Sequence, residues 1–323
     1  MKSFKMQRII WAIDPFDRES GGQQALTSVL EQFSNLDGVE IQPVYISKAE
    51  YAFLPLEKVA YEALREMIEE IDIIGMNGPK IFKSDSATVK SAVDALIKYS
   101  REVDGDLIVT QTHGRQGVRR LVLGSFAETL LMRSPIPVLT INPYIVPSQK
   151  FQRILFPTDF DHHAVSLFKQ VVAFAKAIGG RIILHHIILT PILPYAGDVG
   201  FAQEYESLIQ DYTRRETEKA NKHAKAWTQY AAKEGVPLEL ALETNGNSIW
   251  EHIIHMAEKH KVKLIALETK RGPTEAAVFG SITRNLSRYA DCPVLVLSSH
   301  YSEHLTEQTR KALRKKGSKR HSK

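Results

Sequence analysis

The sequence predicts an α/β protein made of two duplicated domains, and three observations support this. Residues 107–141 and 264–297 share one plan: an apolar strand, a glycine-containing loop, a Gly-Ser that opens a helix, and an apolar strand after proline. RIIWAIDPF at 8–16 and RILFPTDF at 153–160 both carry a strand that ends in aspartate. Strand and helix patterns alternate in both halves, as in largely parallel sheets covered on both faces. The offset of roughly 150 residues is a domain's length.

The first half contains five predicted strands and three predicted helices before its Gly-Ser helix. The helix at 22–36 is predicted from apolar residues at helical spacing, from Leu26 to Phe33 and Leu36. We expect Phe53, Leu56, Tyr61 and Leu64 to be core residues. The predicted strands are 8–13, 39–46, 81–83, 106–111 and 137–141, and the other helices are 56–74 and 87–100.

The second half repeats this order with an insertion. Its predicted strands are 153–156, 181–188, 238–243, 263–268 and 293–297. The helix at 164–178 has apolar core positions and closes on Gly179-Gly180, which favours a left-handed cap. The insertion, near 190–215, is rich in Pro and Gly and is followed by a charged helical pattern to about residue 232. The insertion is either a lid or a packing element.

These patterns divide the chain into domain 1 (residues 1–145), domain 2 (151–298) and a basic tail (299–323). The linker at 142–150 is short and contains two prolines, so we expect the halves to pack together. The strands at 138–141 and 294–297 would be exposed apolar edges unless they were covered. We therefore predict an intrachain pseudo-dimer, and further homo-oligomerisation stays open.

Composition favours a cytoplasmic protein. Of the 323 residues, 43% are hydrophobic and 24% charged, which is ordinary for a well-cored globular protein. No apolar run approaches the roughly 20 residues that span a bilayer, so we expect no membrane partner. The N-terminus enters a strand without a signal-peptide pattern. The single cysteine, Cys292, excludes an intramolecular disulfide and is expected in the core.

The net charge of +5 is concentrated at the C-terminus, where residues 310–323 carry eight basic side chains and no acid. Two interpretations stay open for this tail: a solvated, frayed terminus, or an electrostatic tether to nucleic acid or another acidic partner.

The loop after the fourth strand is a candidate anion site. It contains Gly114, and the following helix opens at Gly124-Ser125. Backbone N–H groups and a helix N-terminus attract phosphate, and glycine allows close approach. Ser125 adds a hydroxyl donor and Arg115 adds positive charge. Asp14 ends the first strand on the same predicted rim, where its carboxylate would accept hydrogen bonds from ribose or adenine.

These motifs resemble the universal stress protein family, whose nucleotide-binding members carry G-x2-G-x9-G-[ST] after the fourth strand. Gly114 and Gly124-Ser125 match its second and third elements, while Gln111 replaces the first glycine. In the second copy Glu268 takes that place and Pro273 removes an amide donor. The resemblance implies Rossmann-like domains with five-stranded sheets, of the adenine nucleotide alpha hydrolase type. It also implies binding of ATP or a related adenine nucleotide, possible use of Mg, and a role in the stress response with weak or absent hydrolysis.

The resemblance defines a first site and a second, weaker one. The first site comprises Asp14, Gln111, His113, Gly114, Arg115, Gly124 and Ser125. The second comprises Pro157, Thr158, Asp159, Gly280, Ser281 and Thr283. We expect no catalytic residues, since no general base or nucleophile elbow is recognisable.

Rival interpretations remain for several residues. Asp14 and Asp159 are equally explained as caps of the turns that follow them. His252 and His255 lie at metal-ligand spacing, but no third ligand follows, so we expect no metal. For the whole chain, the alternative is a degenerate scaffold that binds no nucleotide and acts through protein contacts. A third reading is a nucleotide-hydrolysing or nucleotidyl-transferring enzyme.

Overall fold

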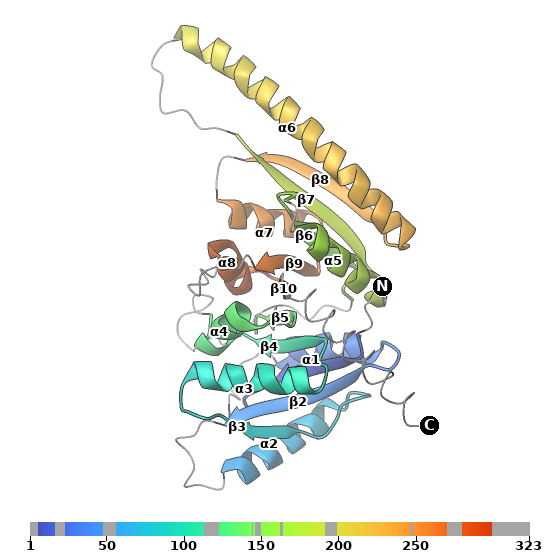
Figure 1. Cartoon of the computed structure of the whole chain (residues 1–323), viewed down its shortest axis with the longest axis vertical. Coiled ribbons are helices and arrows are strands. Elements are labelled where there is room, and N and C mark those ends of the chain that lie inside the picture. Colours follow the sequence, from blue (N-terminus) through green and yellow to red (C-terminus); the bar gives the residue numbers. More distant parts are fainter. Residues whose placement is uncertain are drawn as a thin grey trace, which may run out of the picture. The chain divides into compact units, whose positions relative to one another are not determined.

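The computed structural model confirms the α/β prediction (Figure 1). It describes residues 6–16, 23–47, 56–112, 123–143, 145, 150–161, 164–190, 199–245, 248–269 and 280–298. The chain forms two compact units, which we describe separately. The larger unit contains residues 5–150 and 267–323, and the smaller unit contains residues 1–4 and 151–266.

The larger unit is built on a parallel sheet with one antiparallel edge strand. The strand order is β3-β2-β1-β4-β5-β10. Strands β1 to β5 run parallel, and β10 is antiparallel to β5. The strands are β1 (Arg8–Ala12), β2 (Glu40–Ser47), β3 (Lys80–Lys83), β4 (Leu107–Gln111), β5 (Val138–Ile141) and β10 (Val294–Ser298). The predicted strands are therefore correct to within one or two residues.

The described part of the larger unit contains five helices. They are α1 (Gln23–Ser34), α2 (Leu56–Ile71), α3 (Val89–Glu102), α4 (Ser125–Arg133) and α8 (Ser281–Tyr289). The stripe predicted in α1 is confirmed, because Leu26, Leu30 and Phe33 are buried. One core prediction was wrong: Tyr61 is 42% exposed. Helix α2 buries Leu64, as predicted, together with Ala60, and Tyr61 is turned about 100° around the helix from Ala60.

The smaller unit repeats the arrangement. Its strand order is β9-β6-β7-β8, with parallel pairings between neighbours. These strands are β6 (Arg153–Pro157), β7 (Arg181–Leu189), β8 (Leu238–Asn245) and β9 (Leu264–Thr269), whose last residues fall beyond the unit boundary. Helix α5 (Ala164–Ile178) ends as predicted: Gly179 has a φ of 65°, and the Gly180 N–H donates to the Ala175 carbonyl (2.8 Å).

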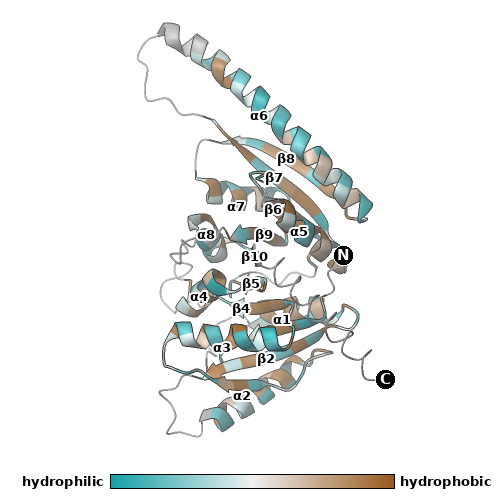
Figure 2. Cartoon of the chain, viewed as in Figure 1, coloured by the Kyte–Doolittle hydropathy of each residue, from teal (hydrophilic) through white to brown (hydrophobic). Residues whose placement is uncertain are grey.

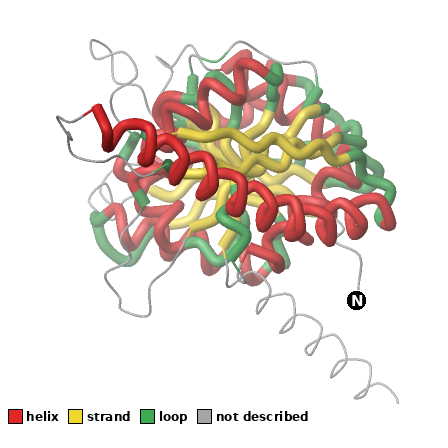
Figure 3. Tube along the Cα trace, turned by 90° about the horizontal axis from the view of Figure 1, so that it is seen from above, coloured by secondary structure: helices red, strands yellow, loops and turns green. Residues whose placement is uncertain are grey.

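The predicted charged helix exists and is long. Helix α6 (Val199–Lys233) has 35 residues, and α7 (Ile249–Lys259) follows β8. Figure 2 shows α6 as largely hydrophilic beside apolar strands. Its buried face carries small residues, Ala220, Ala224 and Ala231, around one large ring, Trp227. It contacts β7 and β8 and runs along the strands in Figure 3. Residues 191–198 of the insertion lie outside the described residues, so the choice between lid and packing element stays open there.

The expected cover of the apolar edge strands is confirmed for β5 and β10. They pair in register, with Val294 opposite Thr140, Leu295 opposite Leu139 and Val296 opposite Val138. The residues of both strands are buried wherever their side chains are described. Pairing satisfies both backbone edges, which an unpaired strand would leave exposed.

Candidate functional site

The sheet of the larger unit has the geometry of a ligand-binding edge. Strand β1 lies between β2 and β4, so the sheet extends from β1 through β2 and β3 on one side and through β4 and β5 on the other. In open parallel sheets, ligands bind beyond the carboxyl ends of the strands at such a point. Asp14 follows β1 and Gln111 ends β4, and the two strands are neighbours, with Ala12 opposite Thr110. The fold therefore brings these two predicted residues to one edge.

Asp14 caps a turn at this edge. Its Oδ1 accepts a hydrogen bond from the Phe16 N–H (3.0 Å), and the aspartate is exposed. Phe16 is 48% exposed, and its ring meets Tyr45 of β2 edge-on, with centroids 5.9 Å apart. The turn-capping interpretation of Asp14 is thus correct. It does not exclude a ligand, because a carboxylate can accept more than one hydrogen bond.

The loop that begins after β4 is anchored at its start. Thr112 donates its N–H to the Ile141 carbonyl (2.9 Å), which ties the end of β4 to β5. Gln111 is half-buried. The predicted site residues His113, Gly114 and Arg115 lie outside the described residues.

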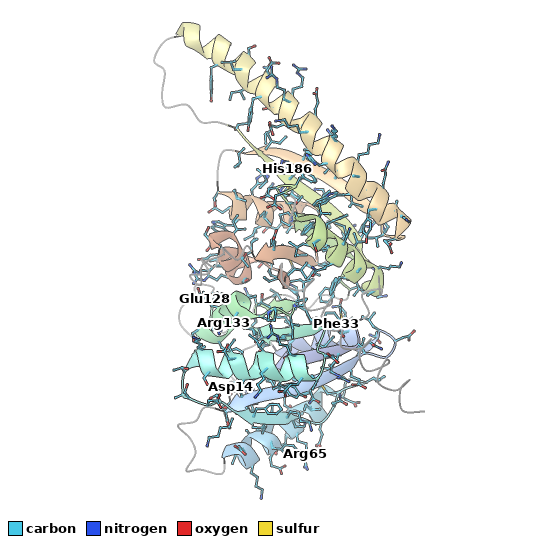
Figure 4. The ribbon with its side chains drawn as sticks, viewed as in Figure 1. Asp14, Phe33, Arg65, Glu128, Arg133 and His186 are labelled. Atoms are coloured by element: carbon cyan, nitrogen blue, oxygen red, sulfur yellow. The ribbon has the colours of Figure 1, made fainter. Side chains whose placement is uncertain are left out.

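Helix α4 begins at Ser125, as predicted. Gly124 precedes it with φ −59° and ψ 142°, and its carbonyl accepts the Glu128 N–H (2.9 Å). Glycine has no side chain with which to cap the helix. The first helical amides have no partner within the helix and suit an anion. Ser125 is exposed beside them. Negative charge in this first turn comes from Glu128 (labelled in Figure 4), which forms an ion pair with Arg284 of α8 (2.7 Å).

The residues of the predicted second site fall into different compact units. Pro157, Thr158 and Asp159 lie in the smaller unit, and the other three lie in the larger one. Gly280 and Ser281 are exposed at the start of α8, whereas Thr283 is buried.

The β6 end in the smaller unit resembles the β1 end closely. Asp159 Oδ1 accepts the Asp161 N–H (3.2 Å), which is the same turn cap as at Asp14. The Thr158 N–H donates to the His185 carbonyl (2.8 Å), just as the Ile13 N–H donates to the Val44 carbonyl (3.0 Å). His185 therefore stands where the first repeat has Val44.

An aromatic cluster, which sequence reasoning missed, surrounds Phe160. Its ring centroid lies 5.0 Å from His186, 5.8 Å from His223 and 5.1 Å from Trp227. Trp227 also stacks on Phe168 of α5 at 4.5 Å. Phe160 has a φ of 58°, a left-handed conformation that bulky residues rarely adopt. His223 and Trp227 of α6 therefore pack against the loop that follows Asp159.

A polar cluster also lies in the smaller unit. Burial lowers the pKa of His185 to about 4, and its Nδ1 donates to the Ala241 carbonyl (3.1 Å). The His252 ring lies 5.6 Å from that of His185, and its Nε2 lies 3.0 Å from Glu243 Oε2. The hydrogen bond from Lys259 lowers the pKa of Glu243. Among the described residues, no group of three or more His, Cys, Asp or Glu could hold a metal.

A groove of about 480 Å³ in the smaller unit separates the middle of α6 from the ends of β7 and β8. Threonines line it on both sides: Thr190, Thr213, Thr217 and Thr244. Among the described lining residues, Arg214 is paired with Asp211 (3.0 Å) and with Glu218 (3.8 Å), which also lines the groove. The two charges of this lining therefore balance.

Taken together, the repeated strand ends and Gly-Ser helices define a tandem α/β protein built from two copies of one parallel-sheet repeat. The family model described as "Universal stress protein family" matches residues 6–142 and again 150–298. The chain therefore belongs to the universal stress protein family, as a member with two tandem domains.

Individual relatives agree with this assignment. Universal stress protein MJ0531 from Methanocaldococcus jannaschii is 24% identical over 185 residues, which cover 53% of this chain and all of the relative. A universal stress protein structure from Archaeoglobus fulgidus DSM 4304 matches with a TM-score of 0.63 and 18% identity, covering 92% of this chain and 100% of that one.

A functionally unknown protein, PA1789 from Pseudomonas aeruginosa PAO1, matches with a TM-score of 0.58 and 15% identity, covering 95% and 98% of the two chains. At these identities, the structural matches show the fold alone. Within the described residues, no helix is both long and apolar enough to cross a membrane.

Proposed function

We propose that this protein is a stress-response regulator that binds ATP or a related adenine nucleotide at the first-repeat edge. The observation that carries the proposal is the convergence of Asp14, Gln111 and the Gly124-Ser125 helix start on one repeat of a universal stress protein fold. Amides at the start of α4 would hold phosphate oxygens, and the Ser125 hydroxyl would donate to them. The Asp14 carboxylate would accept from a ribose hydroxyl, with Mg as a possible companion of the phosphates.

The first repeat is the better candidate for physical reasons. Its Asp14 loop is exposed, with Phe16 at the surface. The corresponding loop of the second repeat is packed by α6 around Phe160. Glu268 and Pro273, in the second phosphate loop, add negative charge and remove an amide donor.

The proposed mechanism is a population shift with little or no catalysis. A nucleotide that binds one arrangement of the loop between Gln111 and Ser125 more tightly would favour that arrangement and alter a surface that a partner contacts.

Equilibrium dialysis of the full chain against labelled ATP, with and without magnesium, tests the proposal. We expect Ser125→Ala to weaken binding roughly tenfold, because a hydrogen bond to a charged group is lost. Ser281→Ala is the matched variant at the equivalent helix start of the second repeat, and it should weaken binding less than Ser125→Ala. Absence of binding at millimolar ATP would contradict the proposal while leaving the family assignment intact.

A degenerate scaffold that acts through protein contacts is the second candidate. Gln111 and Glu268 replace the family's first glycine in both loops, and this favours a protein without nucleotide. Mass spectrometry of small molecules released from purified, denatured protein separates the two candidates, since only a nucleotide binder should release one.

We also propose a cytoplasmic location, domains at residues 1–145 and 151–298, and a basic tail from 299 that contacts acidic partners or nucleic acid. Removal of residues 301–323 should then abolish salt-sensitive partner binding.

A further inference from the structure

Helices α4 and α8 occupy equivalent places in the two repeats. Each has nine residues and begins with serine after a glycine whose dihedrals are nearly the same, −59° and 142° against −56° and 136°. The segments 124–141 and 280–297 align without a gap, at a constant separation of 156 residues. Every residue in one segment therefore has a defined counterpart in the other.

The contacts between these segments follow an approximate two-fold axis inside the larger unit. Leu139 pairs with Leu295, its own counterpart. On either side the pairings are reciprocal, because Val138 faces Val296 and Thr140 faces Val294. Such reciprocity is the signature of an isologous contact.

Glu128 and Arg284 are also counterparts, and they meet each other. Arg284 Nη2 and Nε lie 2.7 and 2.8 Å from the same oxygen, Oε1 of Glu128. The two side chains are partly buried, with 38% of Arg284 and 26% of Glu128 exposed. The larger unit thus has opposite charges at a place where perfect symmetry would put identical residues.

Two further bonds across this face are asymmetric. Thr140 Oγ1 donates to the Val294 carbonyl (3.3 Å), but the counterpart of Thr140 is Val296, which has no hydroxyl. Asn142 Nδ2 donates to the Arg288 carbonyl (3.1 Å), but its counterpart is Ser298. Each of these hydrogen bonds is donated by a first-repeat side chain to a second-repeat carbonyl.

We propose that Glu128 and Arg284 make this face selective for the unlike repeat and reject a like one. Two first-repeat faces would bring Glu128 against Glu128, and two second-repeat faces would bring Arg284 against Arg284. Like charges facing each other at a partly buried contact repel, and wrong partners are rejected in this way. The partner that fits the α4–β5 face is therefore the α8–β10 segment and not the same face of a second copy.

Charge reversal in the full-length chain tests this selectivity. E128R and R284E each place like charges at the axis, and the double variant restores attraction with reversed polarity. We expect each single variant to lower the equilibrium constant for folding of the larger unit roughly tenfold in urea titrations. The double variant should recover to within about threefold of the unmodified chain. Additive losses in the double variant would overturn the proposal.

Mixing the single variants tests partner choice directly. When E128R and R284E chains are unfolded and refolded together, two chains can exchange their repeats. The substituted position 128 of one chain then meets the substituted position 284 of the other. The unmodified Glu128 and Arg284 of the two chains then also meet, so both contacts in the exchanged pair are attractive. Native mass spectrometry should detect a species with one chain of each kind, absent when either variant refolds alone. A mixture that contains only single chains would show that these charges do not select the partner.

Arg133 and Asp94 provide the matched control (Figure 4 labels Arg133). This pair also uses an arginine–carboxylate contact from α4, at 2.9 and 3.1 Å, with 40% and 44% of the side chains exposed. It joins α4 to α3 within the first repeat. D94R and R133D chains refolded together should give no mixed species. Mixed species in this control would mean that exchange follows from destabilisation alone, and the proposal would fail.

Discussion

The ends of β1 and β6 carry the same aspartate cap in two different surroundings. Both turns are capped by an aspartate that accepts the N–H two residues later, and both follow a strand bonded to its neighbour in the same way. After Asp14, Phe16 lies at the surface against one ring, Tyr45. After Asp159, Phe160 is packed against His186, His223 and Trp227. The repeated aspartate cap does not fix the backbone of the turn, because Pro15 is confined to negative φ whereas Phe160 has a φ of 58°. Distant elements decide whether the turn stays open to a ligand.

The largest expected effect is a difference in the stability lost when an aromatic ring is removed at each of the two turns. Trp227→Ala removes the ring that contacts Phe156, Phe160 and Phe168, and should destabilise the smaller unit by roughly 3 to 5 kcal/mol. Phe16→Ala, at the open turn, should lose less than about 1 kcal/mol, because its ring is half exposed. Urea unfolding followed by circular dichroism measures both. Equal losses would show that the two turns are packed alike.

A second difference concerns pH, since the position of Val44 in the first repeat is taken by His185 in the second. The pKa of His185 is about 4 in the fold against 6.5 in the unfolded chain. As pH falls from about 6.5 to about 4, the unfolded chain takes up a proton that the folded one excludes. About 3 kcal/mol of stability should be lost over this window.

His185→Val is the test variant for this difference, because it installs the first-repeat residue. Unfolding free energies measured between pH 7.5 and 4 should fall less steeply for the variant than for the unmodified chain. Identical slopes would mean that His185 does not carry the effect.

The smallest effect concerns the turn caps themselves. Asp14→Ala and Asp159→Ala each remove an acceptor for one backbone N–H and should each lose about 1 kcal/mol. If the first repeat binds the nucleotide, only Asp14→Ala should also weaken ATP binding in the dialysis assay. A weaker affinity in Asp159→Ala instead would move the proposed site to the second repeat.

Local patterns in the sequence predicted the framework well. Apolar alternation and helical spacing fixed the strands to within one or two residues, and Gly179-Gly180 fixed the end of α5. Tyr61 was misassigned because an aromatic residue next to a buried position looks apolar in the sequence, although the helix turns it outward.

Contacts between distant residues were the part that local patterns did not predict. His223 and Trp227 reach Phe160 from a different element, and nothing in the spacing along the chain relates them. The Glu128–Arg284 pair did leave a signal, since aligned copies show opposite charges at one position. Such a position in a duplicated sequence is informative once the strand pairing is known.

The length of α6 has a consequence for its own stability. Thirty-five helical residues extend over about 52 Å, whereas the eight residues of β8 extend over about 27 Å. The strand thus supports only about half of the helix. Around residues 211–219 the remaining turns carry ladders of neighbouring charges, Arg214 with Asp211 and Glu218, and Lys219 with Glu216. Raising the ionic strength screens such pairs and should therefore fray the N-terminal half of α6. The buried alanine face should stabilise the C-terminal half.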